Sequence, residues 1–190
     1  MEGELVLKDM SAASPAAVGF YGLGFAATFA GLLNMGMFSD ALMVIAMAIT
    51  LGGIAEIIAG LQLWSKGDTF GASAFTIFGL WWIAFAYINL APAGIFSAPM
   101  EAASATSMGF FTLVWGLIAT TLTIATLKIG LKMLTVVFVV LDLTFFSLAL
   151  VFFGMFPLAI AGAITLITGL VALYIATALV YDSVGLKLPL

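Results

Sequence analysis

The chain has 190 residues, of which 65% are hydrophobic and only 7% charged, with five lysines, no arginine, nine acidic residues, no histidine and no cysteine. A soluble domain carries about 25% charged and about 45–50% apolar residues, so this composition excludes a water-facing globular domain and predicts an integral membrane protein. The lack of histidine and cysteine excludes the usual haem ligands, N/S zinc sites, Ser-His and Cys-His nucleophile pairs, and disulfides.

The first fourteen residues are predicted to form a short cytoplasmic tail. Acidic residues stand where a signal peptide would need a basic region, and no apolar segment of about 7–15 residues follows directly. We therefore expect the segment 1–14 to be retained as a tail.

Residues 15–182 are predicted to be one transmembrane domain. Breaks in hydropathy leave six apolar segments, each long enough to cross a hydrocarbon core of roughly 30 Å as a helix of about 20 residues. Their continuous apolar runs exclude barrel strands, which alternate apolar and polar residues. We expect an all-α integral membrane protein with a C-terminal tail over 183–190. The loop 91–105 has room for a short interfacial helix. The expected spans are about Pro15–Leu33, Ala41–Leu63, Phe70–Leu90, Thr106–Leu127, Met133–Phe153 and Leu158–Tyr181.

The lysines predict the orientation. Loops that carry lysine stay in the cytoplasm, and here lysines occur before span one, between spans two and three, between four and five, and after span six. The other three loops contain none. Both termini are therefore expected in the cytoplasm, as an even number of spans requires. The lysines are Lys8, Lys66, Lys128, Lys132 and Lys187.

Two acidic residues fall inside spans, Glu56 in span two and Asp142 in span five. Both are expected roughly 10–14 Å below the cytoplasmic interface. No lysine lies at that depth to pair with them, so we expect at least one to hold a proton much of the time. Such a residue is either a proton-binding or substrate-contacting group, or a neutral acid that joins two helices by hydrogen bonds. For Asp142 the second interpretation is favoured.

Polar and small residues supply further candidates. Ser14 and Pro15 open span one as a helix cap followed by proline, and free N–H groups at such a helix start can bind a small anion. Gly19 belongs to a small-residue face that serves either close helix packing or a pore. Asn34 can cap a helix end or loop, and Thr76 can donate a hydrogen bond to a carboxylate.

The stretch from Gly52 to Trp82 closely resembles the acetate uptake transporter family, also called succinate–acetate permeases. It begins Gly-Gly-Ile-Ala-Glu-Ile-Ile-Ala-Gly60, and its most specific part is the turn Lys66-Gly-Asp-Thr-Phe-Gly71 followed by Ala74-Phe-Thr76. The resemblance extends over about Ser14 to Asp182. The family motif Asn-Pro-Ala-Pro-Leu-Gly-Leu reads Ser14-Pro-Ala-Ala-Val-Gly-Phe20 here.

This resemblance implies a homohexamer in the cell membrane, each protomer with its own pathway for acetate and related small monocarboxylates, with succinate as a further candidate. Movement would be proton-coupled or channel-like. The family's hydrophobic constriction aligns with Leu23, Phe78 and Leu141, and a small residue that can limit substrate size aligns with Ala172. Glu56 stands where the family usually has glutamine.

Several alternatives stay open at this point. The protein could be a membrane scaffold that only mediates assembly, or a channel for another small solute. A membrane enzyme would have to work with carboxylates and hydroxyls, and its one candidate metal site would be Glu56 with Asp142. We expect no enzyme activity, no cofactor, no metal and no nucleic-acid partner; membrane lipid surrounds the chain.

Overall fold

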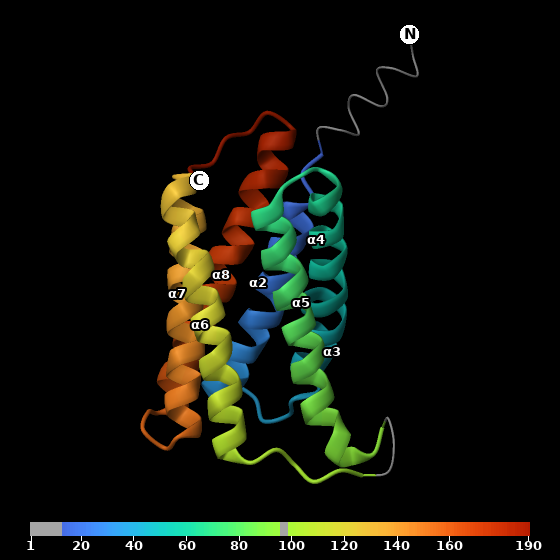
Figure 1. Ribbon diagram of the computed structural model, residues 1–190, viewed down its shortest axis with the longest axis vertical. Helices are drawn as coiled ribbons and strands as arrows, with labels where there is room; N and C mark the ends of the chain where they lie inside the picture. Colours follow the sequence, from blue (N-terminus) through green and yellow to red (C-terminus); the bar gives the residue numbers. More distant parts are fainter. Residues whose placement is uncertain (1–12, 96–98) are drawn as a thin grey trace.

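The computed structural model describes residues 13–95 and 99–190. Within them, six helices are long and apolar enough to cross a membrane, and they stand side by side as a bundle (Figure 1). Five are α2 (Ala16–Asn34), α5 (Thr69–Leu90), α6 (Ala105–Ile129), α7 (Lys132–Phe152) and α8 (Leu158–Ser183). The remaining span, Leu42–Ser65, joins α3 (Leu42–Met47), the π-helical segment η1 (Ala48–Ala55) and α4 (Glu56–Ser65).

The all-α fold with six spans is confirmed, and the expected span limits differ from those of the helices by at most two residues. Most of the expected tail 1–14, including Lys8, lies outside the described residues. In the loop 91–105, the structure has a short 3-10 turn over Ala91–Ala93, and Met100 N–H donates to the Ala91 carbonyl at 3.2 Å. Residues 96–98 of this loop lie outside the described part of the chain.

Glycines set how closely the helices approach. A side chain added at Gly31 of α2 would meet the backbone nitrogen of Leu166 on α8 at 2.5 Å. One added at Gly169 of α8 would meet the backbone nitrogen of Thr28 at the same distance. Helices in lipid gain little from hydrophobic burial against one another, so close backbone packing of this kind supplies much of their association.

Side chains cap the starts of two of the described helices. Asp68 caps α5 by accepting a hydrogen bond from Gly71 N–H at 2.8 Å, and Ser104 caps α6 by accepting one from Ser107 N–H at 3.1 Å. Gly130 ends α6 with φ +80°, a conformation that suits glycine. The expected cap at the start of span one is wrong by one residue. Pro15, not Ser14, occupies the cap position of α2, and no side chain caps that end.

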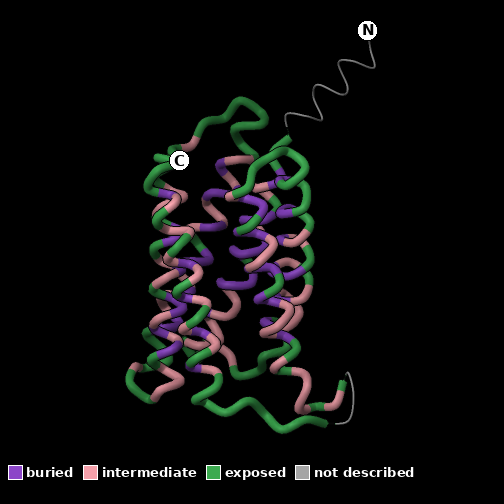
Figure 2. The backbone as a smooth tube through the Cα atoms, viewed as in Figure 1, coloured by how far each residue is buried: buried purple, intermediate pink, exposed green. Residues whose placement is uncertain are grey.

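Buried residues gather along the inward faces of the helices, and the outer faces of the bundle carry the exposed ones (Figure 2). Many exposed residues are large and apolar, such as Leu80, Leu117 and Leu170. A surface of this kind is stable in hydrocarbon and costly in water.

The last residues of the chain fold back against the bundle. The Tyr174 hydroxyl on α8 donates to the Pro189 carbonyl at 2.8 Å, and Lys187 pairs with Asp182 at 3.3 Å. This end of the bundle, where α2 begins and α8 ends, is called the termini end below. The four lysines of the described residues all lie at helix ends or connections there (Figure 1): Lys66, Lys128, Lys132 and Lys187.

Candidate functional site

Two cavities enter the bundle from opposite ends. The termini-side cavity has a volume of about 240 Å³ and is bounded by residues of α2, α4, α5, α7 and α8, with Leu190 of the tail at its wall. The far-side cavity has a volume of about 450 Å³ and extends to Asn34, Asn89 and Pro92 at the opposite end. Each is large enough for a short carboxylic acid.

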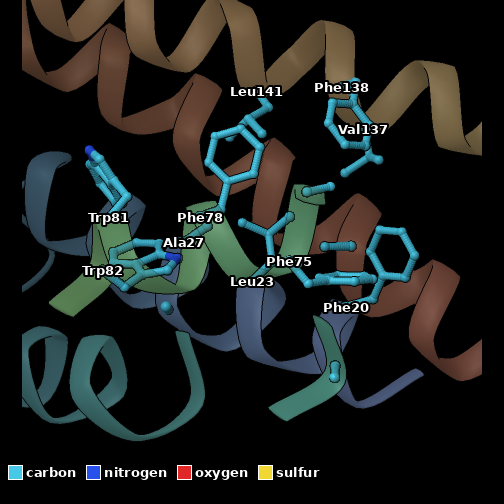
Figure 3. Packing of buried hydrophobic residues seen from close by; sticks show 14 of the residues in the cluster. Phe20, Leu23, Ala27, Phe75, Phe78, Trp81, Trp82, Val137, Phe138 and Leu141 are labelled. Atoms are coloured by element: carbon cyan, nitrogen blue, oxygen red, sulfur yellow. The ribbon is translucent and has the colours of Figure 1, made fainter. Parts of the chain in front are cut away.

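Leu23 of α2 and Leu141 of α7 line both cavities, so they stand where the two cavities meet. Phe78 of α5 lines the termini-side cavity next to them. All three side chains are buried, and Figure 3 shows them directed toward one another from three helices. The residues expected to form the constriction are therefore brought together between the cavities.

Aromatic packing holds Phe78 in place. Its ring stacks on Phe145 of α7 with centroids 5.9 Å apart, and it contacts Trp115 of α6 at 6.0 Å and Phe138 of α7 at 6.4 Å. Three neighbouring rings leave little freedom for rotation, so the ring is a fixed part of the wall.

Glu56 is buried in the termini-side cavity wall, with 1% of its surface exposed. The Trp82 side chain hydrogen-bonds the Glu56 carboxyl group, whereas Oε1 of that group has no partner among the described residues. Glu56 is the first residue after η1, and a side chain at Gly22 of α2 would lie 3.0 Å from its Cγ. The glycine therefore makes room for the acid between two helices.

Asp142 lies elsewhere, between α6 and α7, and lines neither cavity. The Thr123 hydroxyl donates to its Oδ2 at 2.7 Å. Glu56 and Asp142 therefore do not share a site, and within the described residues no cluster of three metal-ligating acids occurs.

The remaining predicted residues near the termini end have different surroundings. Ser14 lines the termini-side cavity, and Pro15 is buried beside it at the start of α2. Gly19 packs against Phe75, whose ring would lie 2.5 Å from a side chain added there. Thr76 faces α4 at the contact with Gly60 and lines neither cavity.

Asn34 and Ala172 complete the predicted set. Asn34, the last residue of α2, lines the far-side cavity. Ala172 of α8 is fully buried and lines neither cavity.

The structure adds features to the site that we did not predict. Trp81 lines the far-side cavity together with a buried pair of hydroxyls, Thr144 and Thr168, whose oxygens are 2.9 Å apart. The π-helical segment η1 precedes Glu56, and its adjacent Gly52 and Gly53 are the one sequence signal that could have marked it. Among the described lining residues of the far-side cavity, none is charged.

Comparison with known proteins identifies the family of the chain. A model of the GPR1/FUN34/yaaH family matches residues 3–185. The chain is 36% identical over 167 residues to the succinate-acetate/proton symporter SatP of Escherichia coli K12, covering 86% of each chain. It is 31% identical over 144 residues to acetate permease A of Emericella nidulans, covering 72% of this chain and 48% of that one. It also resembles a solved structure described as the bacterial acetate channel SatP, with a TM-score of 0.86, 34% identity, and 93% and 97% of the two chains covered.

Proposed function

The chain belongs to the GPR1/FUN34/yaaH family, and we propose that it is a multi-pass cell-membrane protein that moves acetate across the membrane through each protomer. The observation that carries this proposal is the pair of cavities that approach from opposite ends and meet at Leu23 and Leu141. The named relatives are a symporter, a permease and a channel for acetate. None of these is an enzyme.

The apolar narrowing sets what can pass. Leu23, Phe78 and Leu141 present no hydrogen-bond donor, and transfer of a bare carboxylate into such surroundings is costly. The neutral acid, or acetate moving with a proton, meets a much smaller cost. A dry ring of this kind also opposes hydrated ions and can gate by dewetting. We propose that these three residues are the constriction of the pathway.

Glu56 is the proposed proton-carrying group. It lies in the wall of the cavity that ends at the constriction, it is buried, and one of its carboxyl oxygens has no partner among the described residues. A carboxyl group in this position can gain or lose a proton beside the substrate. We propose that Asp142, bonded to Thr123 between α6 and α7, instead joins two helices.

The proposed orientation places the termini end in the cytoplasm. The lysines of the described residues gather at that end, and loops rich in lysine are retained inside. Under this orientation the termini-side cavity, with Ser14 at its wall, is the cytoplasmic mouth and the far-side cavity opens outward. The segments 1–14 and 183–190 are proposed as cytoplasmic tails of the domain 15–182, and the protein as a homohexamer with one pathway in each protomer.

The test is uptake of labelled acetate into liposomes that hold the purified protein, with and without an inward proton gradient. Empty liposomes made in parallel give the leak of acetic acid through lipid. We expect uptake above this leak that saturates, is competed by propionate and rises with the gradient. Succinate as competitor tests the wider substrate range.

Uptake no faster than the leak, from protein shown to be folded, would contradict the transport proposal and favour a scaffold or another solute. Saturable uptake that does not depend on the proton gradient would support acetate movement and would refute proton coupling. Native mass spectrometry in detergent tests the hexamer independently of transport.

A further inference from the structure

Trp81 on α5 carries a buried donor that no residue in the described part of the chain satisfies. The side chain is 8% exposed and lines the far-side cavity. Its indole Nε1 is covered and has no hydrogen-bond partner among the described residues. A buried N–H without an acceptor is unfavourable, so this group favours any acceptor that reaches it from the cavity.

Four rings fix the plane of this indole. Trp82 and Phe145 meet it edge to face, with centroids 4.6 and 5.1 Å away, and Phe85 and Phe111 stack on it at 5.7 and 6.4 Å. In Figure 3 the Trp81 nitrogen points away from Phe78 and Leu23, whereas the Trp82 nitrogen points toward Ala27. The donor therefore has a set direction that a rotating side chain would lack.

Most of the other polar groups of the far-side cavity are already engaged. The Thr144 and Thr168 hydroxyls bond each other at 2.9 Å, the Asn89 amide donates to the Phe85 carbonyl at 2.8 Å, and the Thr112 hydroxyl donates to the Met108 carbonyl at 2.9 Å. Since no charged residue lines the described part of this cavity, a carboxylate there would meet neither a lysine nor a repelling acid. The Trp81 N–H is then a buried donor of this cavity that is still without an acceptor among the described residues.

We propose that the Trp81 indole N–H binds the substrate's carboxylate on the far side of Leu23 and Leu141, as a waiting position before the constriction. This inference rests on the proposed function and adds to it a binding residue and a ligand class, a monocarboxylate with a short apolar tail. The carboxylate accepts from Nε1, and the tail lies against the surrounding aromatic rings, which also line the cavity. On this basis Trp81 affects substrate affinity more than the rate of passage.

The first test is direct. The chain has four tryptophans, so protein labelled with ¹⁵N-tryptophan gives four indole N–H signals, each assigned by replacement with phenylalanine. We expect sodium acetate, titrated against sodium chloride at equal ionic strength, to shift the Trp81 signal along a saturating curve. The signal of Trp64, which is 70% exposed at the end of α4, should not move.

The second test is functional. Trp81→Phe keeps an aromatic ring at this position and removes the N–H together with part of the indole. In proteoliposomes we expect the acetate concentration for half-maximal uptake to rise about tenfold, equivalent to about 1.4 kcal/mol, with a smaller change in maximal rate. Trp64→Phe is the control and should match the unchanged protein.

The outcomes separate this inference from the proposed function. Saturable uptake with a Trp81 signal that acetate does not move would refute the inference and leave transport standing. A moving signal without uptake above the leak would support the binding residue and refute transport. Neither effect in folded protein would refute both. If Trp81→Phe fails to fold, the titration of the unchanged protein still decides.

Discussion

Replacing Leu23 with alanine should widen the junction of the two cavities and relax the size limit of the pathway. Leu23 is 7% exposed and is a wall of both cavities, so the loss of three side-chain carbons would join spaces of about 240 and 450 Å³. One methylene of substrate in a fitted apolar site changes selectivity by about 1–3 kcal/mol. We therefore expect the preference for acetate over propionate to fall about tenfold, which is about 1.4 kcal/mol.

The cost in stability should be moderate. Truncation of a buried leucine to alanine destabilises a protein by about 2–5 kcal/mol, depending on how many packed neighbours lose contact. Leu23 already faces open space on two sides, so the lower end of that range is expected. Thermal unfolding in detergent measures this cost and shows that the variant is folded before its transport is interpreted.

The assay is uptake of labelled acetate and propionate into proteoliposomes, with the leak into empty vesicles subtracted for each acid. Leu33→Ala is the matched control, because Leu33 is on the same helix but lines the far-side cavity alone. A ratio of acetate to propionate uptake that stays the same in Leu23→Ala, or changes equally in Leu33→Ala, would refute the idea that the narrowing selects by size.

Three other changes test separate parts of the structure. Glu56→Gln keeps an acceptor for the Trp82 side chain but cannot exchange a proton, so gradient-stimulated acetate uptake should fall to the rate seen without a gradient. Asp142→Ala removes the acceptor of Thr123 and should lower stability by about 0.5–1.5 kcal/mol, whereas Asp142→Asn, which retains an acceptor, should keep most of that stability and the response to the gradient. Gly169→Val places a side chain against the Thr28 backbone and should cost about 1–3 kcal/mol, measured as a lower thermal midpoint in detergent.

The six spans could be predicted because hydrophobicity and helix length follow directly from the thickness of the bilayer. The acids inside the spans could also be recognised, since a carboxylate in an apolar run is rare for a physical reason. The different surroundings of the two acids could not be predicted. Glu56 and Asp142 have the same expected depth. Only the packing of α2, α5 and α6 around them places Glu56 in a cavity wall and Asp142 at a contact between helices.

Leu23, Phe78 and Leu141 came from motif resemblance, and the structure brings them together because α2, α5 and α7 meet at the centre of the bundle. Thr76 was expected near the substrate and instead packs against Gly60 on α4. Side-chain direction on a helix that is apolar all round cannot be read from periodicity, because no polar face marks the outside. For the same reason the Trp81 donor was not predicted, because the sequence does not distinguish Trp81 from the adjacent Trp82.

The π-helical segment Ala48–Ala55 determines the direction in which the side chains that follow it on α4 point. A π-turn holds one residue more than an α-turn, and each residue of a helix advances the direction of its side chain by about 100°. Glu56 follows this segment directly, so its aim is a property of the backbone as much as of the residue type. Wound as a regular α-helix, the same eight residues would turn the Glu56 side chain toward a different face of the helix. The position of this carboxyl group therefore depends on the number of residues per turn in 48–55. A comparison of residue types at position 56 alone would not reveal it.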